Sequence, residues 1–164
     1  MRIRQERPGD EAAIRTLTDA AFRGVAFSNQ TEAAIVEALR AASVLTISLV
    51  AVEAGKIVGH VAFSPVMIDG AGGDWYGLGP VSVRPDRQRS GIGQALVRDG
   101  LRRLGSMAAG GCVVLGDPGY YSRFGFQYDP ELWYGDVPAG YFQRLILGGP
   151  APKGEVHFHP SFDA

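Results

Sequence analysis

The chain has little lysine, little net charge and no long apolar segment, and each shortage limits which partners it can bind or how it can bind them. Only two of its 16 basic residues, Lys56 and Lys153, are lysines. A phosphate-bearing ligand would therefore be bound through arginine, which can donate two parallel hydrogen bonds to it. The formal net charge of −1 argues against a broad surface for nucleic acid or anionic membrane. We therefore expect neither of these partners.

A single cysteine, Cys112, lies within an apolar run, which excludes an intramolecular disulfide and a thiolate metal site. No stretch approaches the roughly 18 apolar residues that a bilayer span needs, and no signal-peptide core follows the first residues. With 46% hydrophobic and 20% charged residues, the 164 residues are typical of one globular domain covering 1–164. These features predict a cytoplasmic protein.

The order of elements predicts a single alternating α/β (α+β) unit. Strands are expected near Ile3 and over 44–52, 57–68, 75–83, 112–115, 141–147 and 156–158, with helices after Asp10, over 31–40 and from Ile92. We expect Asp10 to cap the first helix. A hairpin turn is predicted at 53–56 and a second turn at 69–74.

The most informative stretch runs from Val81 to Leu96. A β-branched strand is followed by a polar turn and by Gly91 and Gly93, which open a helix with apolar positions at Ile92 and Leu96. Glycines there let successive N–H groups point into one concavity, and the helix start adds unpaired donors and partial positive charge. This pattern predicts a cradle for a pyrophosphate group.

Two common phosphate loops do not fit this stretch. A dinucleotide-binding turn needs G-x-G-x-x-G, and a P-loop needs a Lys-Ser/Thr pair after its second glycine. The segment from Gln88 to Gly93 has neither feature. Its Q-x-x-G-x-G pattern, preceded by the strand 78–83, resembles the acyl-CoA-binding motif of the GNAT family of N-acetyltransferases. A glycine-rich turn that merely packs tightly is the structural alternative.

A second segment, Gly116 to Phe126, carries the same resemblance. An aromatic pair, Tyr120-Tyr121, is followed after three residues by Gly125-Phe126, and one helix and one strand separate this segment from the first motif. The residues in and around both motifs resemble those of the YhbS-like branch of the GNAT family. The resemblance extends over about residues 1–162.

The resemblance implies a mixed, mostly antiparallel twisted sheet flanked by helices, with splayed central strands, and acetyl-CoA as co-substrate without a metal. Pro80 removes a ladder donor within a strand, so it predicts a bulge, and the alternative is a proline tolerated in a frayed strand. Main-chain groups of Val81 and Val83 would pair with the pantetheine amides. The cofactor-binding candidates are Val81, Ser82, Val83, Gln88, Arg89, Ser90, Gly91, Ile92, Gly93, Gln94, Asp117, Tyr120 and Arg123.

For catalysis, the resemblance implies that Tyr121 protonates the leaving thiolate. Its phenol, with a reference pKa of about 10, is protonated at neutral pH. A backbone N–H near Val81 would stabilise the developing oxyanion. No carboxylate lies in the strand 75–83, so the general base is not identified, and Glu32 and His60 are candidates to replace it.

The acceptor is expected to be an amine on a small molecule, a peptide or a protein. The resemblance places it between the loop 23–30 and the late strands 133–142. The acceptor-side candidates are Phe27, Asn29, Glu32, His60, Trp133 and Tyr134. The sequence leaves a homodimer open, and a non-catalytic acyl-CoA sensor is the alternative function. His157 and His159 share one strand face without a third ligand, so we expect surface histidines there.

Overall fold

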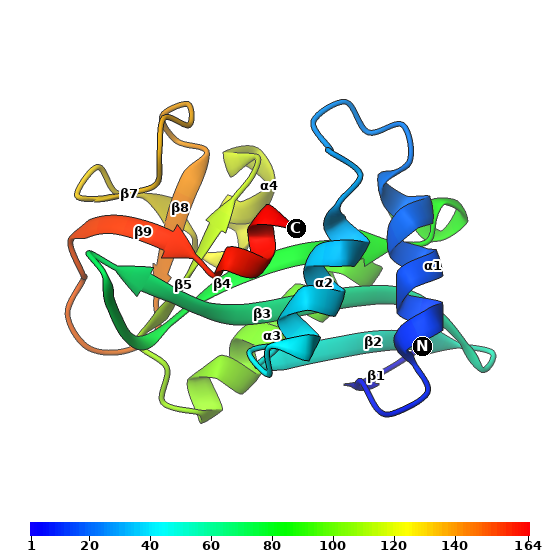
Figure 1. Ribbon diagram of the computed structural model, residues 1–164. Coiled ribbons are helices and arrows are strands. Elements are labelled where there is room, and N and C mark those ends of the chain that lie inside the picture. Colours follow the sequence, from blue (N-terminus) through cyan, green and yellow to red (C-terminus); the bar gives the residue numbers. More distant parts are fainter.

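The fold is built on one twisted mixed sheet, described for all 164 residues by a computed structural model (Figure 1). The main strand order is β1-β2-β3-β4-β5-β8-β6, and β9 pairs with both β3 and β7. The strands are β1 (Arg2–Gln5), β2 (Ile47–Glu53), β3 (Lys56–Ile68), β4 (Ala71–Val83), β5 (Gly111–Leu115), β6 (Gln127–Tyr128), β7 (Leu132–Trp133), β8 (Phe142–Ile146) and β9 (Gly154–Phe158). Only the β4–β5 and β7–β9 pairs are parallel, which confirms the predicted mixed, mostly antiparallel sheet.

Helices cover both faces of the sheet (Figure 1). The α-helices are α1 (Glu11–Phe22), α2 (Glu32–Ala41), α3 (Ile92–Ser106) and α4 (Pro118–Tyr121), with short 3-10 helices η1 (Pro85–Arg87), η2 (Ser122–Phe124) and η3 (Pro160–Asp163). On one face Ile14 of α1 and Val36 of α2 pack against Val50. On the other face Leu96 of α3 lies in the same core cluster as Phe63. No helix has the length and apolar character needed to cross a bilayer.

Two local predictions were wrong. The second turn is confined to Asp69 and Gly70, both with positive φ, and β4 already begins at Ala71. A two-residue turn closes this hairpin, so the glycine-rich segment that follows pairs as strand. Asp10 occupies the position before α1, but its side chain does not cap the helix. Its carboxylate instead accepts hydrogen bonds from Arg4 at 2.7 Å and from the Arg7 main-chain N–H at 2.9 Å.

The predicted break in β4 is present and has two parts. A bulge lies between Leu78 and Val81, where Gly79 and Pro80 oppose a single residue of β3. Pairing with β5 covers only residues 75–77, so the rest of β4 has no partner on that side. The two central strands therefore splay apart, as expected.

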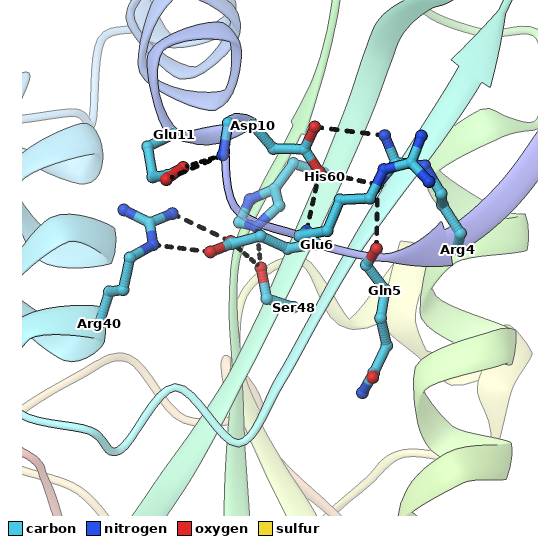
Figure 2. Close-up of polar contacts among 10 residues, drawn as sticks. Arg4, Gln5, Glu6, Asp10, Glu11, Arg40, Ser48 and His60 are labelled. Atoms are coloured by element: carbon cyan, nitrogen blue, oxygen red, sulfur yellow. Dashed lines mark hydrogen bonds and ion pairs between the residues drawn. The ribbon is translucent and has the colours of Figure 1, made fainter.

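A largely buried polar chain joins Glu6, which follows β1, to β2, β3 and α2 (Figure 2). Arg40 donates to both carboxylate oxygens of Glu6, at 2.7 and 2.9 Å, and the Ser48 hydroxyl donates to Glu6 at 2.5 Å. His60 Nε2 lies 2.8 Å from the Ser48 oxygen, while Nδ1 is buried without a partner. Because the Ser48 proton goes to Glu6, Nε2–H is the donor to Ser48, and the ring is held in one neutral tautomer.

Burial is the main cause that lowers the pKa of His60, to about 4. Burial alone would raise the pKa of Glu6, but the hydrogen bonds from Arg40 and Ser48 outweigh it and hold this pKa below its ordinary value of 4.5. The two groups therefore act on stability in different pH ranges. The folded state loses stability through His60 as the pH falls from about 6.5 to about 4, because only the unfolded chain takes up the proton there. Through Glu6 the folded state loses stability only as the pH falls below about 4.5, because the unfolded chain takes up the proton first.

We predict that the free energy of unfolding falls by about 2 to 3 kcal/mol through His60 between pH 7.5 and 4.5. A His60→Gln variant keeps a donor for Ser48 but cannot titrate, so it should lack this loss. Urea denaturation followed by tryptophan fluorescence across the pH range measures both proteins. Equal pH dependence in the two proteins would contradict the prediction.

Candidate active site

A first cavity, of about 400 Å³, lies where β4 ends and α3 begins. Gly91, the residue before α3, has φ of +88°, a left-handed conformation that L side chains rarely adopt. A Cβ on Gly93 would lie 3.4 Å from the Tyr120 hydroxyl, so the missing side chain keeps the cavity open. The first turn of α3 also has main-chain N–H groups without intrahelical partners. The cavity is lined by Val83, Arg87, Gln88, Arg89, Gly91, Ile92, Gly93, Gln94, Tyr120 and Arg123.

The charges around this first cavity are positive, and no carboxylate lines it. Arg87 is bound to Glu53 through two hydrogen bonds of 2.8 Å. Arg123 donates through Nε to the Tyr120 carbonyl at 2.8 Å, and its guanidinium lies 4.5 Å from the centre of the Tyr120 ring. The Arg89 side chain makes no ion pair. Arginine beside a helix start forms a site suited to an anion with several oxygens.

Four other candidates make hydrogen bonds or close contacts within the protein itself. The Gln88 side chain donates to the Val83 carbonyl at 3.1 Å, and the Ser90 hydroxyl donates to the Arg87 carbonyl. Asp117 accepts a hydrogen bond of 2.9 Å from the Gly119 N–H and so caps α4 without lining the cavity. The buried Ser82 hydroxyl lies 3.4 Å from that of Thr18, so this side chain faces α1.

A second cavity, of about 390 Å³, opens at the β4 bulge. Residues of α1, α2, β4, β5, α4, β9 and η3 contribute to it, and η3 lies beside α2 (Figure 1). Its lining consists of Phe22, Glu32, Ile35, Leu78, Gly79, Pro80, Val81, Leu115, Tyr121, Tyr134, Phe158 and Phe162. The splayed part of β4 and the side chain of Tyr121 therefore line the same cavity.

The ring of Tyr121 is fixed by aromatic neighbours and by a glycine. It meets the Tyr120 ring edge-on at 5.0 Å and the Phe126 ring at 6.0 Å. A Cβ on Gly116 would lie 2.5 Å from the Tyr121 ring, so only glycine leaves room for it. Burial, with smaller contributions from Tyr120 and Cys112, raises the pKa of Tyr121 to about 12. The phenol is therefore a protonated donor over the whole physiological range.

Glu32 is the only charged side chain that lines the second cavity. It lies in the first turn of α2, and its two carboxylate oxygens lie 2.7 and 2.8 Å from the Ser28 hydroxyl, which donates to them. Tyr134 is about a hundred residues further along the chain but lines the same cavity. Its ring meets the Phe158 ring edge-on, with the ring centres 5.0 Å apart. No group of three His, Cys, Asp or Glu side chains that could hold a metal occurs in the structure.

The other acceptor-side candidates lie outside this cavity. Phe27 is 98% exposed and Asn29 is also exposed, because the loop between α1 and α2 turns both side chains away. Trp133 lines a separate pocket beside β7. His60 is fully buried in the polar chain with Ser48, so it cannot contact an acceptor in this conformation.

Sequence reasoning missed several apolar residues of the cavity. Phe158 and Phe162 come from the C-terminal segment, which β9 carries back across the sheet to pair with β3. One signal was available for Phe158: in a strand it faces away from His157 and His159, which were expected on the surface. His157 is 58% exposed in its side chain, in agreement with that expectation. His159 differs from it, because it follows the end of β9, is only partly exposed and caps η3 by accepting a hydrogen bond from the Ser161 N–H. Nothing in the local pattern placed Phe22 or Leu115 in the same cavity.

Comparison with known proteins assigns this arrangement to a family. The model of the acetyltransferase (GNAT) domain matches residues 45–128, which include β4, the first cavity and the Tyr120-Tyr121 pair. The N-acetyltransferase YhbS of Escherichia coli K12, described as uncharacterized, is 40% identical over 97% of this chain and 98% of its own length. The chain belongs to the GNAT family.

Solved GNAT structures agree along the whole chain. A GNAT acetyltransferase from Brucella melitensis, solved in complex with acetyl-CoA, has 56% identity and a TM-score of 0.89, covering 99% of this chain and 97% of that one. E. coli YhbS in complex with CoA gives a TM-score of 0.90, covering 99% and 92%, with 33% identity over the structural alignment. The GNAT resemblance of the two sequence motifs is confirmed.

We predict that Gly116→Ala lowers the free energy of unfolding by about 1 to 3 kcal/mol, because the added methyl group meets the Tyr121 ring. The matched control is Gly105→Ala in the last turn of α3, where an added Cβ meets no atom within 4 Å. That variant should keep or gain up to about 1 kcal/mol, since alanine favours helix. Denaturant unfolding measures both. Equal effects of the two substitutions would contradict the assigned contact.

Proposed function

We propose that this GNAT chain, acting as one domain over residues 1–164, transfers the acetyl group of acetyl-CoA to a primary amine by direct attack. One observation carries the proposal: the unpaired edge of β4 runs from the cavity at Val83 and Gly93 to the cavity at Val81 and Tyr121. The acetyl-CoA and CoA complexes of the two relatives support the same co-substrate here.

In this proposal the first cavity binds the pyrophosphate of CoA. Main-chain N–H groups from Gly91 to Gln94, including those of Ile92 and Gly93, donate to it, and Arg89 and Arg123 balance its charge. Gln88 and Ser90 shape the loop through their own main-chain contacts. The size of the cavity and the absence of carboxylates fit this group.

The unpaired edge of β4 binds the pantetheine arm. Main-chain groups of Val81 and Val83 pair with its amides as an added strand would. Ser82 holds this part of β4 against α1, since its hydroxyl contacts Thr18. Asp117 acts on the site only by capping α4, which carries Tyr120 and Tyr121. Tyr120 packs against Arg123 and Tyr121 and borders the first cavity.

Bound acetyl-CoA supplies an activated thioester, and side chains of this protein govern the proton transfers. The amine nitrogen forms the new C–N bond as the C–S bond breaks, and the nitrogen loses one proton while the sulfur gains one. Tyr121 gives its phenolic proton to the leaving sulfur and regains a proton released by the nitrogen. The Val81 N–H, next to the bulge, stabilises the charge on the carbonyl oxygen. Glu32 and Tyr134 contact the amine side of the cavity.

Acetyl-CoA should raise the melting temperature of the wild-type protein, because it binds only the native state. Gly93→Val should abolish this shift, since the branched side chain fills the first cavity beside the Tyr120 hydroxyl. Gly105→Val is the matched control, placed on the same helix in open space. A thermal-shift titration with acetyl-CoA and CoA measures all three. Equal binding by the Gly93 variant would show that the glycines only shape a turn.

Tyr121→Phe tests the chemical step. The variant keeps the ring that packs against Phe126, so acetyl-CoA affinity should be nearly unchanged while kcat falls about 10²- to 10⁴-fold. Steady-state assays of CoA release over an amine panel measure kcat, and calorimetry measures affinity. The Tyr120→Phe variant serves as a control that should keep most of the rate.

The two measurements also separate the enzyme from the alternative, a non-catalytic acyl-CoA sensor. One observation favours the sensor: the strand 75–83 carries no carboxylate to act as base. Tight acetyl-CoA binding without turnover on any amine would establish the sensor. A loss in kcat below tenfold for the Tyr121 variant would leave the enzyme standing and remove Tyr121 as its acid.

A further inference from the structure

The second cavity has an unusual distribution of charge. Of its 12 lining residues nine are hydrophobic, and Phe22, Tyr134, Phe158 and Phe162 form an aromatic part of the wall. Glu32 provides the single charge, and no arginine, lysine or histidine lines the cavity. A ligand there meets one negative group in otherwise apolar surroundings.

The Glu32 carboxylate differs from other partly buried carboxylates of the chain. Glu6 is bound by Arg40, and Glu53 is bound by Arg87, each through two hydrogen bonds. Glu32 receives only the neutral Ser28 hydroxyl and makes no ion pair. A carboxylate offers about four acceptor positions, so Glu32 retains capacity for a cationic donor. The Ser28 hydroxyl meanwhile fixes the carboxylate at the cavity wall.

We infer that the acetyl acceptor is a small primary amine with one ammonium group and an apolar, uncharged body, and that Glu32 determines this specificity by binding the ammonium group. The inference rests on the proposed function, because it takes this cavity as the acceptor site. Aromatic walls contact the body of the amine and also favour a nearby cation. The ammonium group loses a proton to solvent before the neutral nitrogen attacks.

The same lining excludes other classes of amine. A carboxylate or phosphate on the acceptor would be buried next to Glu32 without any cationic partner, which is strongly unfavourable. A polyamine would bring a second ammonium group for which no second carboxylate is present. The cavity of about 390 Å³ also has to hold the acetyl end of the co-substrate. The acceptor therefore belongs with compact arylalkyl or alkyl amines rather than with amino acids or polyamines.

Three probes with one skeleton test this inference: 2-phenylethylamine, L-phenylalanine, which adds a carboxylate, and L-phenylalaninamide, which replaces it by a neutral amide. Calorimetry on the CoA-saturated protein should show binding of 2-phenylethylamine and at least about tenfold weaker binding of phenylalanine. The amide should recover most of the affinity. In assays with acetyl-CoA, kcat/KM should follow the same order.

The Glu32→Gln variant should bind 2-phenylethylamine at least about tenfold more weakly and discriminate less against phenylalanine, because the negative charge is gone. Acetyl-CoA affinity should be unchanged. The matched control is Glu37→Gln, also on α2, whose carboxylate pairs with Arg15 at the surface and lies outside the cavity. It should leave both affinities as in the wild type. Glu32→Asp, which keeps the charge, should retain most of the preference.

The outcomes separate this inference from the proposed function. Absence of 2-phenylethylamine binding, equal affinity for phenylalanine, or an unaffected Glu32→Gln variant overturns the inference. Turnover on other amines in those cases leaves the acetyltransferase proposal intact. Binding with the expected order but without acetyl transfer on any amine overturns the proposed reaction, and with it the assignment of the bound amine as acetyl acceptor.

Discussion

The loss of pairing between β4 and β5 is the constraint on which the rest of the site depends. Two parallel strands that stayed paired beyond Gly77 would satisfy each other's main-chain groups and leave no gap. The bulge at Gly79 and Pro80 displaces β4 at this point, while β3 continues to hold its other edge. One strand thus has a firmly bonded side and a free side. The free side connects the two cavities.

Packing on both faces keeps this free edge in place. On the α1 face Ser82 contacts Thr18, and on the α3 face Val83 borders the start of the helix that carries Gly93. Beyond the gap, the Tyr121 ring is confined by its aromatic neighbours and by the missing side chain of Gly116. A site built from rigid elements in this way holds its reacting groups without large conformational cost.

Most charged side chains near the site are paired within the fold, and a few at the cavities are not. Arg40 with Glu6 and Arg87 with Glu53 neutralise each other within the fold. The charges left at the cavities are of opposite sign at their two ends, with Arg89 at the first and Glu32 at the second. This polarity suits the proposed binding of an anionic co-substrate on one side and of a cationic amine on the other.

The sequence by itself determined the features that depend on short stretches of chain. The strand, turn and helix around Gly91 and the break at Pro80 follow from conformational preferences of neighbouring residues, and the structure contains both. Runs of apolar and β-branched residues likewise predicted most strands. The side chain of Asp10 escaped prediction, because an arginine on another element competes for it.

Only the tertiary structure decided which distant residues share the second cavity. Glu32, Tyr121 and Phe162 come from segments far apart in the chain and line the same cavity. Phe162 reaches it because β9 returns to pair with β3, so that η3 lies beside α2. Phe27 and His60 have plausible chemistry in the sequence, yet one points to solvent and the other is locked in a buried hydrogen-bonded chain. The physical reason is that side-chain surroundings depend on contacts between elements, which no local pattern encodes.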